Sequence, residues 1–333
     1  MSHSGTAHNG GAILALDFGG TKLSAAAVTS GERQWLALER RLSPPAANAQ
    51  SDYRIAVELA KAVLGDQAPA AIGVSFGGPV WANNGTVKLS HHVPGWEGVP
   101  LAERLRRDLR APVAVENDGI IAALGEHRYG AGKGVASLLY ITASTGVGGG
   151  LVLNGQIWHG ADGMAGHIGH LRLEQDGPEC VCGSRGCLES IAAGPAIARE
   201  ARARIAADPQ RGAAMLKAAG GEPAQLTALH VAQLAAAGDP LALALIERAA
   251  TALGVGIGSA ANLLNPSKII VGGGVSKAGA ALWDVMLRTA RETAMPEVSL
   301  YIAPAGLGDD APLWGAVALA QDLLAVPGQE TSG

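Results

Sequence analysis

Two segments of this chain share one pattern: an apolar strand, a bend rich in glycine and threonine, and a second apolar strand. The segments are ILALDFGGTKLSAAAV at residues 13–28 and LLYITASTGVGGGLVL at residues 138–153. Glycine pairs between apolar strands are typical of β-hairpins, so each segment predicts two neighbouring antiparallel strands. The spacing of the repeat is too long for a solenoid. The pattern therefore indicates two similar domains that each contain such a hairpin.

Strand and helix patterns alternate along the rest of the chain, which is typical of an α/β protein. Further strands are predicted at 34–42, 70–76, 112–118, 268–275 and 298–304. Helices are predicted at 54–64, 102–110, 119–130, 190–206, 226–238, 240–265 and 312–325, and another begins near Lys277. A chain of 333 residues exceeds the size at which one hydrophobic core stops growing, so two domains are expected.

The charge balance and the lack of long apolar runs exclude several classes of partner. The net charge is −4 and Lys and Arg form no long run, so we expect no nucleic-acid partner. The chain opens with a polar segment and holds no run of about 18 apolar residues, so neither a signal peptide nor a membrane partner is expected. We therefore expect a cytoplasmic protein whose three cysteines stay reduced.

Three glycine-rich bends each follow an apolar strand. They are the first bend, DFGGTK at 17–22, the second bend, STGVGGG at 144–150, and the third bend, VGGGVS at 271–276. Backbone N–H groups without a nearby Cβ can approach an anion closely, so three such bends favour a polyphosphate ligand. The chain contains neither a complete G-x-x-x-x-G-K-[ST] motif nor a complete G-x-G-x-x-G motif. Three ordinary tight turns remain the alternative.

Asn117 and Asp118 end a predicted strand immediately before a helix. A carboxylate at this position projects toward the edge of the sheet where α/β proteins bind their ligands. Asp118 could therefore be a base near a substrate hydroxyl, and the alternative is that it only caps the helix at 119–127. The neighbouring phosphate-like bends favour the catalytic role.

All three cysteines lie close together, and a histidine precedes them. They form the pattern C-x-C-x₄-C at Cys180, Cys182 and Cys187, and His170 lies ten residues upstream. Three thiolates and one imidazole make a closed tetrahedral shell, which is typical of structural zinc. Gly183 and Gly186 would let the chain curl around the metal. The sequence therefore predicts a structural Zn²⁺ site.

Six motifs appear in a specific order: DFGGTK, ENDGIIAALGE, STGVGGG, GADGMAGHIGH, CVCGSRGCLE and VGGGVS. With these motifs the chain resembles, from about Ala12 to Leu324, the ROK family of repressors and sugar kinases. That resemblance implies the two-lobed actin-like ATPase fold, which is ribonuclease H-like, with a central cleft. It implies a small lobe at 12–118 plus 313–326, a large lobe at 119–312, and a homodimer.

The resemblance also implies an activity, namely phosphorylation of the 6-hydroxyl of an aldohexose by MgATP, with Asp118 as the general base. The ATP-binding residues would come from the three bends: Asp17, Gly19, Gly20, Thr21, Lys22, Ser144, Thr145, Gly146, Gly148, Gly273 and Gly274. The sugar-binding residues would be Gly78, His92, Asn117, His167, His170 and Glu189. His170 would thus join the zinc site to the sugar pocket.

The chain departs from the family pattern at two positions. Most of these kinases carry EIGH where this chain has HIGH, so His167 replaces a sugar-contacting Glu. The family also carries Asn before PGW in a pattern like PNIPGW, where this chain has His92. The AGHIGH stretch is similar to N-acetylmannosamine kinases, whereas VPGWEGVPL is more similar to glucokinases. Glucose and N-acetylmannosamine, or another N-acetylhexosamine, are therefore the candidate substrates.

Two other functions compete with that of a kinase. The DNA-binding repressors of the family carry a winged helix-turn-helix before the first bend, and the few residues before Asp17 leave no room for one. A sugar-binding or sensing protein without catalysis is the second alternative, and the presence of Asp118 and of both phosphate bends counts against it.

Overall fold

The computed structural model describes residues 11–90 and 92–325, which form two compact units. Within the described chain, the first unit contains residues 11–130 without residue 91, the segment Gly160–Met164, and the C-terminal residues from Asp310 onward. The second unit contains Ala131–His159 and Ala165–Asp309.

The sequence prediction placed the lobe boundaries at 118 and 313, and the structure divides the chain at Gly130 and at Asp310. At the first boundary the difference has a physical cause. Helix α3 (Asp118–Arg128) packs along helix α10 (Ala311–Ala325), so both helices belong to the first unit. Val326, the last residue of the predicted small lobe, lies outside the described residues.

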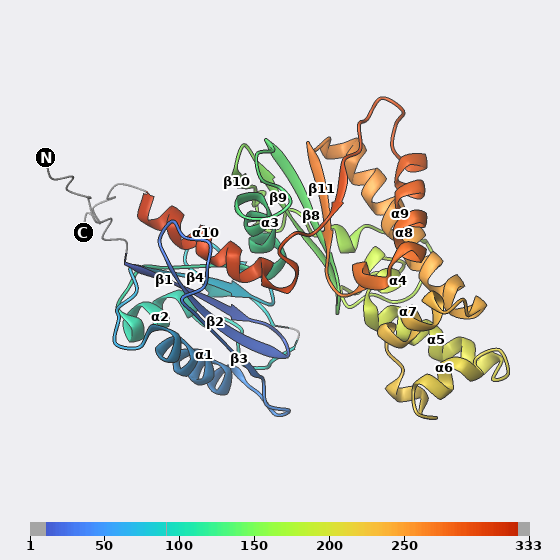
Figure 1. Cartoon of the computed structure of the whole chain (residues 1–333), viewed down its shortest axis with the longest axis horizontal. Coiled ribbons are helices and arrows are strands. Elements are labelled where there is room, and N and C mark those ends of the chain that lie inside the picture. The colour runs from blue at the N-terminus through green and yellow to red at the C-terminus, as the bar shows by residue number, and fades with distance from the viewer. Residues whose placement is uncertain (1–10, 91, 326–333) are drawn as a thin grey trace, which may run out of the picture. The chain divides into compact units, whose positions relative to one another are not determined.

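The first unit is a five-stranded sheet with helices on both faces (Figure 1). The strand order is β3-β2-β1-β4-β7. The strands are β1 (Ala12–Phe18), β2 (Lys22–Thr29), β3 (Ala37–Leu42), β4 (Ala71–Phe76) and β7 (Val113–Asn117). The other elements are helices α1 (Ala49–Leu64) and α2 (Leu101–Leu109) and the small ribbon of β5 (Val80–Trp81) and β6 (Thr86–Val87). Strands β1, β4 and β7 run parallel, and β2 and β3 complete the sheet by antiparallel pairing.

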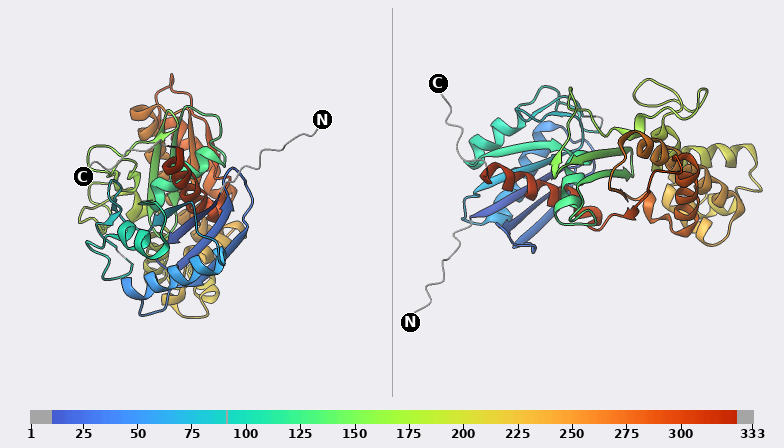
Figure 2. Two further views of the ribbon diagram at one scale, coloured as in Figure 1. Left: turned by 90° about the vertical axis from the view of Figure 1, so that its left-hand side faces the viewer. Right: turned by 90° about the horizontal axis from the view of Figure 1, so that it is seen from above.

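The two faces of this sheet are covered by segments from opposite ends of the chain. Leu14 and Leu16 of β1 belong to the core that includes α1 and α2. Ile13 and Ala15 are equally buried but alternate with those residues, so they face α10, which contacts both β1 and β4. Figures 1 and 2 show α10, in red, running along this face. Because both faces are covered, residues 12–16 of β1 are apolar throughout rather than alternating.

Helix α10 comes unusually close to α3 at Gly315. A Cβ atom built on Gly315 would lie 1.9 Å from the backbone oxygen of Ile121, and no side-chain rotation relieves contact with a backbone atom. We therefore expect Gly315→Ala to lower the free energy of unfolding by about 2–3 kcal/mol, as overpacked core sites do. Urea unfolding checks this, with Leu324→Ala on the exposed side of α10 as the control. Equal stability of the two variants would contradict the close packing.

The second unit repeats the sheet plan of the first. Its strand order is β10-β9-β8-β11-β12, in which β8 and β9 form a hairpin and β8, β11 and β12 run parallel. The strands are β8 (Ser137–Ala143), β9 (Val147–Leu153), β10 (Gln156–Ile157), β11 (Lys268–Gly272) and β12 (Ile302–Pro304). Each hairpin thus occupies the same place in its sheet, which confirms the structural repeat predicted from residues 13–28 and 138–153.

Six helices pack in the second unit: α4 (Leu188–Ala192), α5 (Gly194–Ala207), α6 (Ala213–Ala218), α7 (Ala228–Ala236), α8 (Pro240–Leu264) and α9 (Ala280–Thr293). Helices α8 and α9 lie side by side in both figures. The single helix predicted at 190–206 is in fact two, because Ala193 is extended, with φ −68° and ψ 152°. Pro195 lacks an N–H group and favours such a break before it.

Helix α8 is long and apolar enough to cross a membrane by length and composition alone. Most of it is buried, however, and residues such as Leu253 and Ile257 belong to the core of the second unit. A core helix of a globular protein passes the same test, so this helix is weak evidence for a membrane span.

Candidate active site

The first bend holds a carboxylate in a protein environment that disfavours its charge. Asp17 lies opposite Ser75 in the parallel pairing of β1 and β4, and the Ser75 hydroxyl donates to Asp17 Oδ1 at 2.7 Å. Burial raises the pKa of Asp17 to about 6, against the lowering effect of the Ser75 hydrogen bond, and the charge of Asp118 adds to the rise. The bend itself is closed by Gly19 N–H, which donates to the Lys22 carbonyl at 3.1 Å.

The raised pKa of Asp17 makes the stability of the protein depend on pH. Since the pKa rises from 3.8 to about 6 on folding, this carboxyl favours folding below about pH 4, and that contribution is lost as the pH approaches 6. Asp17→Asn should therefore raise the free energy of unfolding by about 3 kcal/mol at pH 7.5 and by little at pH 4. Urea unfolding at both pH values checks this, with exposed Asp66→Asn as the control. An equal gain in the free energy of unfolding at both pH values would contradict the raised pKa of Asp17.

Asn117, rather than Asp118, caps helix α3. Asn117 Oδ1 accepts from the backbone N–H groups of Gly119 and Ile120 at 3.1 and 3.2 Å. Asn117 Nδ2 donates to the Gly78 carbonyl at 3.1 Å and to Asp118 Oδ1 at 3.0 Å. Gly119 N–H donates to the same Asp118 oxygen at 2.8 Å. Capping by Asn117 therefore fixes the orientation of the Asp118 carboxylate, and the capping alternative for Asp118 is not what the structure shows.

His92 lies against the first bend. A Cβ atom built on Gly20 would lie 2.7 Å from Cγ of His92, so the histidine ring packs directly on the Gly20 backbone. A cavity of about 500 Å³ opens beside this contact, lined by His92, Gly20, Thr21 and the segment Ser43–Ala47. In the first unit, the structure thus places the histidine that departs from the family pattern next to the phosphate-like bend.

The second bend is held at both ends. Ser144 N–H donates to the Gly146 carbonyl at 2.8 Å, which closes the turn between β8 and β9. Gly194 N–H donates to the Ser144 carbonyl at 2.7 Å, and Val147 N–H donates to Glu189 Oε2 at 2.9 Å. Glu189 is half-buried and lies in the first turn of α4. The residue predicted to bind sugar is therefore also a hydrogen-bond acceptor for the bend.

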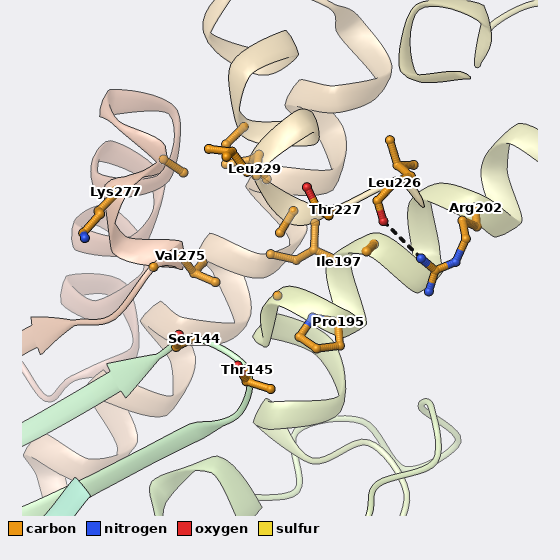
Figure 3. Close-up of a pocket in the computed structure, with 17 residues that line it drawn as sticks. Ser144, Thr145, Pro195, Ile197, Arg202, Leu226, Thr227, Leu229, Val275 and Lys277 are labelled. Carbon is orange, nitrogen blue, oxygen red and sulfur yellow. Dashed lines mark hydrogen bonds between the residues drawn. The ribbon is translucent and has the colours of Figure 1, made fainter. Parts of the chain in front are cut away.

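A large, mostly apolar cavity of about 560 Å³ opens beside the second and third bends (Figure 3). Its volume lies in the usual range for small-molecule sites. Ser144 and Thr145 line one end, and Gly274 and Val275 of the third bend line another. Gly273 lies just before this wall, where its carbonyl accepts from the Ser276 hydroxyl at 2.7 Å.

Sequence reasoning missed most of the cavity wall. The missed residues come from α5, α7, α8 and the turn before α7: Ile197, Ala198, Arg202, Leu226, Thr227, Leu229, Ala232 and Ile246. Arg202 donates to the Leu226 carbonyl at 3.1 Å and so fixes that turn (Figure 3). The other wall residues are mostly apolar, as in the buried face of any helix. The sequence alone therefore does not distinguish residues that line a cavity from residues of a core.

The four predicted metal ligands converge. Their ligand atoms all lie within 4.8 Å of one another, with 3.8 Å between the sulfurs of Cys182 and Cys187 and 3.7 Å between Cys180 Sγ and His170 Nδ1. Tetrahedral zinc with Zn–S bonds of about 2.3 Å holds two sulfurs about 3.8 Å apart, so the donor set fits zinc. Burial raises the pKa of Cys187 to about 12, and a bound cation is what would hold its sulfur as a thiolate.

Glycine allows the chain to close around these ligands. Gly183 and Gly186 both have positive φ, 87° and 69°. At Gly186 a Cβ atom would also lie 1.7 Å from the backbone oxygen of Glu174, so only glycine fits there.

His167 lies just before the 3₁₀ turn Ile168–His170, and its ring is nearly parallel to that of His170, with centroids 6.3 Å apart.

The family model described as "ROK family" matches residues 13–323. This chain belongs to the ROK family. A glucokinase of Halalkalibacterium halodurans is 41% identical over 73% of this chain and 74% of its own length. An N-acetylmannosamine kinase of Citrobacter koseri is 33% identical over 92% of this chain and 98% of its own length. The crystal structure of a ROK family glucokinase from Streptomyces griseus, in complex with glucose and AMPPNP, has a TM-score of 0.81 at 33% identity, covering 94% of this chain and 100% of that chain.

In this ROK family chain, the predicted site residues fall into one group in each unit. The first group is Asp17, Gly19, Gly20, Thr21, Lys22, Gly78, His92, Asn117 and Asp118. The second group is Ser144, Thr145, Gly146, Gly148, His167, His170, Glu189, Gly273 and Gly274, with the three cysteines. The two-sheet α/β fold expected from the resemblance is confirmed, since solved ROK kinases share it.

Proposed function

We propose that this chain is an ATP-dependent sugar kinase that phosphorylates the 6-hydroxyl of an aldohexose. The observation that carries the proposal is the arrangement at Asp118, whose carboxylate is held by Asn117 and Gly119 and lies close enough to Asp17 to raise its pKa. A positioned carboxylate can accept the proton of a sugar hydroxyl late in the reaction. Phosphoryl transfer otherwise depends on positioning and charge neutralisation.

Each unit has its own candidate residues for binding the nucleotide. The cavity beside the third bend would hold adenosine, because its wall is apolar and its volume suits a small molecule. The backbone N–H groups of the first and second bends would bind phosphate oxygens. Asp17 offers the hard oxygen ligand that Mg²⁺ prefers, and the bound cation would hold this carboxyl ionised.

Candidate sugar-binding groups lie near Asp118 in the first unit and near the cysteine loop in the second. Glu189, His167 and His170 would contact its hydroxyls, as would Gly78 and Asn117. The hydrogen bonds of Asn117 within the chain suggest that it also positions Asp118. His92 packs on Gly20, so we expect the His92 side chain to contact the sugar next to the first bend. A buried group left unpaired costs about 1–3 kcal/mol, which makes these residues candidates for sugar selection.

Zinc at the Cys₃His site would be structural. Four protein ligands leave no open coordination position for chemistry, so the metal would hold His170 and the cysteine loop, residues 170–187, in place. We also propose that the protein is cytoplasmic and forms a homodimer, and sedimentation analysis would test the dimer.

A coupled ADP-release assay tests the proposed function. Zinc-loaded protein would be given MgATP with glucose, mannose, fructose, N-acetylglucosamine or N-acetylmannosamine in turn. We expect turnover with glucose or N-acetylmannosamine, since relatives named glucokinase and N-acetylmannosamine kinase are similar over most of the chain. A preference for N-acetylmannosamine would connect His167 to recognition of acetamido sugars. Sugar binding without turnover on any of the five would favour the sensing protein instead.

A further inference from the structure

Helix α4 connects the cysteine loop to the second bend. Its N-terminal flanking residue is Cys187, one of the four zinc ligands of the preceding loop. Leu188 N–H donates to the Leu171 carbonyl at 2.9 Å, which ties the start of α4 to the residue after His170. The start of this helix is therefore fixed by the same segment that carries the metal ligands.

Helix α4 packs against α8 and α5, and its carboxylate Glu189 also reaches the second bend. Glu189 Oε2 accepts from Val147 N–H at 2.9 Å, and Gly194 N–H, just beyond the helix, donates to the Ser144 carbonyl at 2.7 Å. A Cβ atom on Gly146 would lie 2.6 Å from Glu189 Oε2, so the absent side chain is what lets the carboxylate reach the bend. Residues 144–147 are thus held at Val147 by Glu189 of α4 and at Ser144 by Gly194, the first residue of α5.

Glu189 has capacity for a second partner. Among the residues that the structure describes, only the Oε2 atom of this half-buried carboxylate accepts a hydrogen bond. Oε1 is therefore available to accept from a sugar hydroxyl while Oε2 holds the bend. One carboxylate can in this way contact the sugar and hold the bend proposed to bind phosphate.

We infer that Glu189 is a positioning residue for the phosphate-binding bend, and that α4 makes the order of this bend depend on the intact Cys₃His site. The inference rests on the proposed function for the identity of the ligands. The hydrogen bond between Val147 and Glu189 is present without any ligand. Without the carboxylate, Val147 N–H loses its acceptor and the bend opens more often. Without zinc, Cys187 no longer holds the start of α4 in place through a bond to the metal. The bend then also opens more often.

Hydrogen exchange in the ligand-free protein tests the contact directly. We expect Glu189→Ala to lower the protection of the Val147 amide at least tenfold, and removal of zinc from the wild-type protein to do the same. Glu189→Gln should retain most of the protection, because its amide oxygen can still accept. Glu179→Gln is the matched control, since Glu179 lies in the cysteine loop and its carboxylate pairs with Arg185 on the surface. Strand β11 should stay protected throughout, which shows that the unit remains folded.

Nucleotide binding tests the consequence. In the absence of sugar, Glu189→Ala should weaken binding of MgAMPPNP about tenfold, whereas a residue that contacts only sugar would leave it unchanged. Zinc removal should weaken binding to a similar degree, and zinc removal from Glu189→Ala should add little, because both changes act on the same bend.

The outcomes separate the two proposals. Unchanged exchange at Val147 in Glu189→Ala, or losses from the variant and from zinc removal that multiply, would overturn the positioning role. If exchange changes as expected but wild-type protein does not bind MgAMPPNP, the role of Glu189 in ordering the bend stands and the proposed kinase function fails.

Discussion

Asp118→Asn is expected to lower kcat by about 10²- to 10⁴-fold, the usual contribution of a positioned general base. Asparagine retains an oxygen that can accept from Gly119 N–H, so the start of α3 should keep its geometry. It cannot accept the proton of the sugar hydroxyl, and it removes the negative charge that adds to the effect of burial in raising the pKa of Asp17. Sugar affinity, measured by calorimetry, should therefore change little while steady-state turnover falls.

The matched control for this variant is Asp66→Asn, an exposed aspartate in the same unit. It should turn over like the wild-type protein. If Asp118→Asn retained turnover within tenfold of the wild type, Asp118 would not be the base. A loss of sugar affinity as large as the loss of turnover would instead assign Asp118 to sugar binding.

Cys187→Ala is expected to abolish stoichiometric zinc binding and to lower Tm by about 10 °C. Structural zinc sites contribute free energy of folding outright, and for a folding unit of about 150–250 residues, such as the second unit, each kcal/mol corresponds to about 2–4 °C. Cys187 is fully buried, so its removal also leaves a small void beneath α4. Metal analysis by mass spectrometry and thermal unfolding measure the two effects.

A metal chelator should reproduce the loss of Tm in the wild-type protein and have no further effect on Cys187→Ala. Glu179→Gln in the same loop should bind zinc normally, because its carboxylate is exposed and is not among the four converging ligands. Wild-type protein that lacks zinc, and whose Tm is insensitive to chelation, would show that the cysteines serve another purpose.

Sequence reasoning succeeded where a feature is local in the chain. Both hairpins are visible because glycines separate apolar strands, and the Cys₃His group is visible because Cys180, Cys182 and Cys187 lie within one short loop. In both cases the physical cause, a turn conformation or a donor set, is encoded in neighbouring residues.

Sequence reasoning failed where a structural feature is formed by segments far apart in the chain. The wall of the large cavity joins Ile197, Leu229 and Ile246 from three helices, and each looks like an ordinary core residue by itself. The hydrogen bond from Val147 to Glu189 likewise spans the whole cysteine loop. The choice of Asn117 over Asp118 as the cap is local, but both residue types are good caps, so propensity alone could not decide it.

The place of α10 at the end of the chain affects the order in which the protein can assemble during translation. Domains of multidomain proteins usually fold as the ribosome releases them, the N-terminal one first. Here the face of β1 and β4 that α10 covers is synthesised early, and α10 itself is synthesised after the whole second unit. The second unit can therefore complete its core while the first still exposes Ile13 and Ala15. Nascent chains paused before residue 311 should accordingly be the species that chaperones recognise.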